Sequence, residues 1–264
     1  MVMWWIYPVL GVFAGILSGL LGIGGGLLLV GALILILPGQ GVPDSIVVTV
    51  ALASSLASIV LTGLSSAWAH HKRQAVLWPT VAWLVPGLLF GAIFASMGVA
   101  KWAGPNLRWV VIAYCLLVAI QLISNWPAAK TSTDKPVVGM PWTIVGVVIG
   151  AVSSVVGIGG GSMTVPALIL RGVPAVKAVA TSAVCGVFIA LASALTYSQL
   201  TTQQEMPNYS YGFVYLPAAF GVAIASVLFA PLGARWAHQL SAIWLKRIFA
   251  GFLLVMVGLL VINS

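Results

Sequence analysis

A glycine-rich element interrupts two long apolar runs of the chain at matching places. It is Gly22-Ile23-Gly24-Gly25-Gly26 in the first run and Gly157-Ile158-Gly159-Gly160-Gly161 in the second. The first run covers residues 7–37, and as one straight helix it would be about 46 Å long, against a hydrocarbon core of about 30 Å. Adjacent glycines also weaken a helix interior by roughly 1 kcal/mol each relative to alanine. We therefore predict two short helices folded into a hairpin, with the glycines at its tip.

The sequence around these elements is apolar from end to end. Of the 264 residues, 61% are hydrophobic and only 5% are charged, whereas soluble domains carry about 25% charged residues. Apolar runs long enough to cross a bilayer recur along the chain, with no polar stretch large enough for a separate soluble domain. We predict an all-α polytopic membrane protein, with a single membrane domain over residues 1–264.

The two halves of the chain are copies of one unit. Residues 11–35 laid over residues 146–170 agree at 14 of 25 positions. Further along, Ala53-Ser54-Ser55 corresponds to Ala180-Thr181-Ser182. Such internal similarity predicts a tandem duplication, in which each repeat is a broken-helix hairpin followed by three transmembrane helices. The predicted parts are repeat 1 over residues 1–124, a linker over 125–140, and repeat 2 over 141–264.

The lysines and arginines indicate how the two copies are oriented. If each interrupted run returns to its starting side, nine of the eleven basic residues share one side of the membrane, and only Lys101 and Arg108 lie on the other. If each run crosses once, the split is four to seven. The positive-inside rule favours the returning hairpin, so we predict two inverted repeats with both termini outside. Charge counting does not separate a re-entrant hairpin from two short full crossings.

The two glycine elements are the candidate substrate site. Broken helices at matching places of inverted repeats form the midplane sites of secondary transporters. Glycine permits positive φ, and the uncovered N–H groups at a helix N-terminus attract anions. Ser162 and Thr164 add hydroxyl donors after the second element, where the first element has Leu27 and Leu29. We therefore expect the second hairpin to be the more polar half of the site.

The candidate substrate-binding residues are glycines and hydroxyls from both repeats. They are Gly22, Gly24, Gly25, Gly26, Gly157, Gly159, Gly160, Gly161, Ser162 and Thr164, with Ser18, Ser153, Ser54, Ser55, Thr181 and Ser182 in second place. Helix packing is the preferred interpretation for spacings such as Gly11-xxx-Gly15-xxx-Gly19. Packing alone rarely needs three adjacent glycines, so the two glycine elements are interpreted as functional. Nucleotide binding is excluded because the required βαβ context is absent.

Ionisable side chains are nearly absent from the predicted spans. The acidic residues all fall in predicted loops: Asp44, Asp134 and Glu205. His70 and His71 stand beside two further basic residues and are interpreted as part of a solvated basic loop. We therefore expect no relay of buried carboxylates, no metal site, no cofactor and no enzymatic activity.

Together, the length, the duplicated glycine element, the central linker and Ala180-Thr181-Ser182 resemble the TauE/SafE family of sulfite exporters. The resemblance implies export of small sulfur-containing anions such as sulfite or sulfoacetate across the bacterial inner membrane, and we expect alternating access. The expected partners are the anion, protons as coupling ion and the lipid bilayer, with no nucleic acid. A carrier of another small carboxylate or inorganic anion, or a passive anion channel, remains the alternative. The first copy departs from the family pattern with Ala53-Ser54-Ser55.

Overall fold

The computed structural model describes residues 4–21, 25–102, 106–124, 136–201, 204–236 and 242–262. The first half of the chain consists of α1 (Ile6–Leu21), α2 (Gly26–Ile36), the 3₁₀ helix η1 (Leu37–Gln40), α3 (Val47–His71), α4 (Trp78–Trp102) and α5 (Asn106–Ile123). The second half consists of α6 (Met140–Val156), α7 (Gly161–Leu170), α8 (Ala175–Gln199), β1 (Ser210–Tyr211), β2 (Val214–Tyr215), α9 (Leu216–Trp236) and α10 (Ala242–Ile262). Each predicted hairpin is therefore a pair of short helices, and longer helices follow it.

The protein is an all-α polytopic membrane protein. Four of its described helices, α3, α4, α8 and α9, are long and apolar enough to cross a membrane, and the shorter helices are also apolar. Within the described residues, the departure from all-α structure is an antiparallel pair of two-residue strands in which Ser210 lies opposite Tyr215. This pair lies between α8 and α9, directly before α9.

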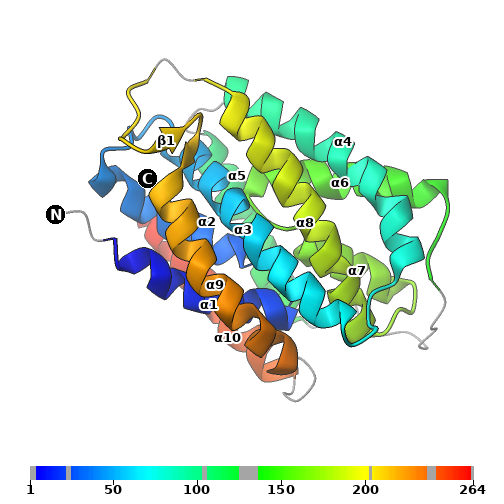
Figure 1. Ribbon diagram of the computed structural model, residues 1–264. Helices are drawn as coiled ribbons and strands as arrows, with labels where there is room; N and C mark the ends of the chain where they lie inside the picture. The colour runs from blue at the N-terminus through cyan, green and yellow to red at the C-terminus, as the bar shows by residue number, and fades with distance from the viewer. Residues whose placement is uncertain are drawn as a thin grey trace.

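Helices α3 and α8 lie side by side at the centre and run in opposite directions (Figure 1). Their middles meet where a Cβ on Gly63 would lie 3.0 Å from Cγ2 of Val187. The segment that follows α3 lies beside the first turns of α8, because the Leu77 N–H donates to Oγ1 of Thr181 at 3.1 Å. The end of α3 is thus next to the start of α8.

Closely spaced glycines join α1 to α9 and α6 to α4. A Cβ at these glycines would collide with the backbone of the partner helix. The colliding pairs are Gly11 with Val222, Gly15 with Ser226, Gly146 with Leu84, and Gly150 with Leu88. The contacts advance along both helices together, so each pair is parallel. The packing interpretation of the small-residue spacing is therefore confirmed for these glycines.

Helix α9 also runs parallel to α3. Two serines of α3 and Arg73, which follows α3, donate to carbonyl groups that lie progressively further along α9. The pairs are Ser58 to Ala219 at 3.1 Å, Ser65 to Val227 at 2.8 Å, and Arg73 to Ala234 at 2.7 Å. Each step toward the end of α3 is a step toward the end of α9. Helices α1, α3 and α9 therefore run in one direction, and α4, α6 and α8 run in the other.

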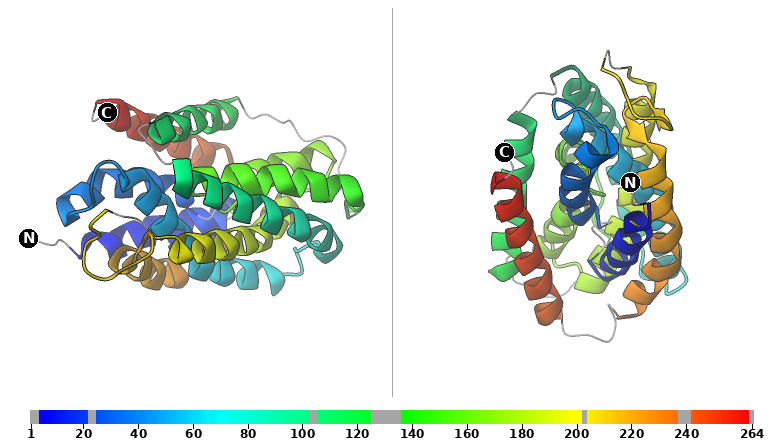
Figure 2. Two further views of the ribbon diagram at one scale, coloured as in Figure 1. Left: turned by 90° about the horizontal axis from the view of Figure 1, so that it is seen from above. Right: turned by 90° about the vertical axis from the view of Figure 1, so that its left-hand side faces the viewer.

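Helices α5 and α10 pack against each other and form an outer layer over one side of the molecule (Figure 2). Helix α2 contacts both α3 and α10. Helix α7 packs on α8, and a hydrogen bond from its first turn reaches α5. The two short helices that begin at the glycine elements therefore lie between the central pair and this outer layer.

The position of His70 differs from the sequence interpretation. Helix α3 continues through His71, and His70 in its last turn is fully buried. Its Nε2 atom lies 3.2 Å from the Gly19 carbonyl oxygen near the end of α1. The prediction of a solvated loop is wrong for His70, because the helix turns this side chain toward α1, whereas His71 is exposed.

Candidate functional site

The two glycine turns have the same backbone conformation. Gly25 precedes α2 with φ 66° and Gly160 precedes α7 with φ 74°, both left-handed and both without a side-chain cap. This conformation is strained for any residue with a Cβ, which explains a glycine at each position. Gly157, which ends α6, is also left-handed at φ 76°. Gly22 and Gly24 lie outside the described residues.

The tips of the two hairpins meet near the middle of α3. A Cβ on Gly26 would lie 3.0 Å from Cα of Ile158 and would collide with the Gly157 carbonyl oxygen. The Ser55 hydroxyl lies between the tips, 3.2 Å from the Gly157 carbonyl oxygen and 3.5 Å from that of Gly26. Residues about 130 positions apart in the sequence are thus brought together, as expected for matching broken helices. Ser55 is the predicted candidate that joins them.

The start of α7 presents backbone donors. The N–H groups of Met163 and Thr164 donate to the Gly160 carbonyl oxygen at 3.2 and 2.9 Å. The N–H groups of Gly161 and Ser162 are the first two of the helix, and such groups have no acceptor within their own helix. The positive end of the helix dipole therefore coincides with these donors.

Two buried hydroxyls adjoin the same turn. Thr164 is fully buried and Ser153 is 1% exposed, and within the described part of the chain neither hydroxyl oxygen has a hydrogen-bond partner. The Ser153 oxygen lies 3.4 Å from the place where a Cβ on Gly160 would stand. A buried hydroxyl without a partner costs about 1–3 kcal/mol, so a guest that accepts hydrogen bonds here would recover that free energy.

The remaining candidate after the second turn, Ser162, is paired with a residue that sequence reasoning missed. The Tyr114 hydroxyl lies 2.7 Å from Oγ of Ser162. Tyr114 belongs to α5, an apolar helix whose sequence gives no sign that one of its residues reaches the glycine turn. Only the fold brings α5 over α7.

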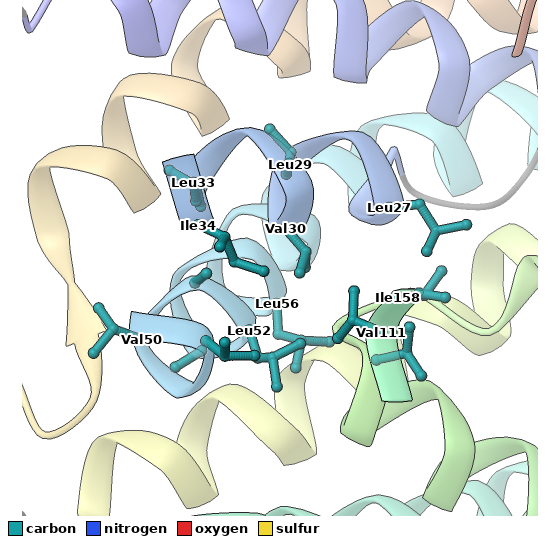
Figure 3. Close-up of a cluster of buried hydrophobic side chains, with 14 of the residues drawn as sticks. Leu27, Leu29, Val30, Leu33, Ile34, Val50, Leu52, Leu56, Val111 and Ile158 are labelled. Carbon is teal, nitrogen blue, oxygen red and sulfur yellow. The ribbon is translucent and has the colours of Figure 1, made fainter. Parts of the chain in front are cut away.

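The first turn has an apolar environment instead. Leu27 and Leu29, at the positions of Ser162 and Thr164, are 2% and 1% exposed. Figure 3 shows Leu27 next to Ile158 from the second turn, with Val111 of α5 close by, and all three belong to one buried cluster. The side chains around the second turn are thus more polar than those around the first, as the sequence predicts.

Four second-place candidates have other contacts in the structure. Oγ of Ser54 accepts the Tyr215 N–H at 2.9 Å, directly before α9, and Oγ1 of Thr181 accepts the Leu77 N–H directly before α4. Each of these two hydroxyls therefore accepts the N–H just before a long helix of the other half of the chain. Ser182 donates to the Val179 carbonyl at 2.8 Å, and Ser18 is buried in α1. A role for these four in substrate binding stays a prediction.

Metal ligands do not gather anywhere in the part of the chain that the structure describes. Over these residues no group of three histidine, cysteine or acidic side chains is placed to hold a metal ion. Cys115 and Cys185 are both buried and free. The chemistry of the two turns is that of backbone amides and uncharged hydroxyls.

Comparison with known proteins gives a family and three relatives. The model of the family described as sulfite exporter TauE/SafE matches residues 7–260. The chain is 33% identical over 246 residues to a probable membrane transporter protein of Haemophilus influenzae, covering 93% of both chains. Proteins with the same description from Methanocaldococcus jannaschii and Bacillus subtilis are 28% and 30% identical, over 94% and 81% of this chain and 91% and 84% of their own. No solved structure matches the chain.

Proposed function

The chain belongs to the TauE/SafE sulfite exporter family, and from this premise we propose that it exports small sulfur-containing anions such as sulfite or sulfoacetate by alternating access. It is a multi-pass membrane protein of a transporter family. The observation that carries the proposal for an anion is the second glycine turn. There the first amides of a helix, which have no acceptor within that helix, adjoin one left-handed glycine together with the buried hydroxyls of Ser153 and Thr164, which have no partner among the described residues.

The described residues around the second turn offer uncharged groups, which suits a carrier. The groups around the second turn are amides and hydroxyls, so an anion there is held by dipoles and hydrogen bonds. Such donors recognise sulfite and sulfonate oxygens, which accept hydrogen bonds on several sides. A transporter must also release its load, and a site built from neutral donors binds more weakly than one with a buried lysine or arginine. We propose no cofactor and no catalytic step.

We further propose that the two repeats are inverted and that the hairpins enter the membrane from opposite sides. Support comes from helix direction: α1, α3 and α9 run one way, while their counterparts and partners α6, α8 and α4 run the other. The meeting of Gly26 with Gly157 and Ile158 supports a shared midplane site. Rocking of the repeats about this point would expose the site to each side in turn.

Cysteine labelling tests the orientation in the inner membrane. Arg73, Val138 and Arg171 are exposed residues for single cysteine substitutions, with Tyr211 as the residue for the other side. The native cysteines are buried and give little background. We expect an impermeant reagent to label the first three from the cytoplasm and the Tyr211→Cys variant from outside, with both termini outside. Labelling of Arg73→Cys and Arg171→Cys from opposite faces would refute the inverted hairpins.

Transport in proteoliposomes tests the function itself. Uptake and counterflow are measured with sulfite, sulfoacetate, taurine and acetate, with and without a pH gradient. Saturable counterflow of sulfite or sulfoacetate is expected, and stimulation by the pH gradient would support coupling to protons. Saturation by acetate alone would identify a carboxylate carrier instead. Flux that does not saturate would indicate a passive channel and overturn alternating access.

A further inference from the structure

The Tyr114–Ser162 pair joins the outer layer of the molecule to the second glycine turn. Ser162 is in the first turn of α7, two residues after left-handed Gly160, where the N–H groups have no acceptor within their own helix. Tyr114 comes from α5, which packs mainly against α10 rather than against α7. The 2.7 Å contact between the two hydroxyl oxygens therefore places a phenol from a separate element beside the polar end of α7.

The pair retains an unused proton. Each hydroxyl has one donor and two acceptor sites, and when one of them donates to the other, the second proton is still available. A phenol and an alcohol that face each other can also both rotate to donate to a third group. Together with the N–H of Ser162, they can supply up to three donors to one small anion with several oxygens.

The positions that match this pair, in α10 and at the start of α2, hold neither a tyrosine nor a serine. The run from Ala113 to Val118 in α5 agrees with the run from Ala250 to Val255 in α10 at four of six positions. In this match Gly251 corresponds to Tyr114, and Leu27 corresponds to Ser162 through the glycine elements. A Cβ on Gly251 would meet nothing within 4 Å. The repeated unit therefore folds without this pair, which points to a chemical rather than a packing role for Tyr114.

We propose that Tyr114 contacts the transported anion and, with Ser162 and Thr164, forms the hydroxyl face of the site. This inference rests on the proposed function and assigns its oxyanion specificity to a residue of α5. The Tyr114 and Ser162 hydroxyls, which hold each other when the site is empty, turn to separate oxygens of one sulfite or sulfonate group. The anion thereby also links the outer layer to the second hairpin.

The test is the concentration dependence of sulfite counterflow by Tyr114→Phe, Ser162→Ala and the double variant in proteoliposomes. Loss of one hydrogen bond to a charged group corresponds to roughly a tenfold weaker interaction. We expect each single variant to raise KM about tenfold with little change in the maximal rate, and the double variant to raise it about a hundredfold. If the Tyr114–Ser162 bond is purely structural, the single and double variants should lower the melting temperature by the same amount and leave KM unchanged. That result would overturn the inference.

Tyr197→Phe is the matched control. The Tyr197 hydroxyl is buried and donates to the Ser154 carbonyl of α6 at 3.3 Å, so its loss is expected to lower the melting temperature and leave KM unchanged. If Tyr114→Phe gives no folded protein, the KM of Ser162→Ala decides: a normal value overturns the inference. Wild-type protein that shows no saturable transport overturns the proposed function and this inference together. Saturable wild-type transport with a normal KM in Tyr114→Phe overturns this inference alone.

Discussion

The two glycine turns share a backbone and differ in what surrounds it. Gly25 and Gly160 are both left-handed and each precedes a short helix. A Cβ on Gly25 would meet backbone, 2.6 Å from the Ala14 carbonyl oxygen, whereas a Cβ on Gly160 would first meet the end of the Ile189 side chain at 2.5 Å. The first turn is thus locked against α1, and the second faces side chains. The two turns therefore share one backbone conformation, whereas the side chains around them form a packed half and a polar half.

The difference between the two turns suggests a different contribution from each hairpin. Around the first turn, Leu27 and Leu29 are packed among apolar neighbours, and such packing acts in a bilayer through dispersion contacts rather than through exclusion from water. Around the second turn, Ser153 and Thr164 have buried hydroxyls without a partner in the part of the chain that the structure describes, which costs stability. We infer that the first hairpin stabilises the fold and the second carries the chemistry.

Substitution of Gly25 or Gly160 by alanine should give the largest difference between the two hairpins. Gly25→Ala adds a clash with backbone to about 1–2 kcal/mol of left-handed strain, so we expect no folded protein in the membrane. Gly160→Ala carries the same strain, but the Ile189 side chain can rotate away. This variant should insert and fold without transporting sulfite. Size-exclusion profiles, melting curves and counterflow measure the outcome, and equal loss of folded protein in both variants would remove the distinction.

Ser55→Ala tests whether the two halves are held together at their tips. Ser55 is fully buried and its hydroxyl lies within hydrogen-bonding distance of the Gly26 and Gly157 carbonyl groups. Leaving buried groups unpaired should lower the free energy of unfolding by about 1–3 kcal/mol, measured as a lower melting temperature. Ser65→Ala is the control, because Ser65 is only half-buried and donates to the Val227 carbonyl at 2.8 Å. A larger loss in the control would show that the contact between the tips contributes little.

Removing a hydroxyl from the second turn and adding one at the first turn should change the free energy of unfolding by smaller amounts and in opposite directions. Thr164→Val removes a buried hydroxyl that has no partner among the described residues and is expected to raise the free energy of unfolding by about 1 kcal/mol while weakening transport. Leu29→Thr introduces such a hydroxyl into the apolar half and should cost about 1–3 kcal/mol. Melting temperatures of both variants check this prediction. A loss of stability in Thr164→Val would mean that its hydroxyl has a structural role.

The short helices of the hairpins and the hydroxyls beside the second turn could be predicted from the sequence, because both depend on local features. The glycine elements interrupt an apolar run, and the hydroxyls of Ser162 and Thr164 follow directly after one of them. Tyr114 could not be identified from the sequence, because only the fold brings its hydroxyl from α5 to Ser162 at the start of α7. Ser54 and Thr181 recur at matching places, yet both accept an N–H that precedes a long helix. Recurrence at matching places of the two halves is therefore also found for residues with structural contacts.

Binding of sulfite to purified protein tests most directly the claim that the second turn is the polar half of the anion site. The double variant Ser153→Ala/Thr164→Val is compared with Ser65→Ala, since Ser65 lies in the first half and its hydroxyl donates to the Val227 carbonyl of α9. Loss of two hydrogen bonds to an anion should raise Kd about a hundredfold in the double variant, while Ser65→Ala should bind like the wild type. An unchanged Kd in the double variant, or an equal loss in Ser65→Ala, would contradict the account.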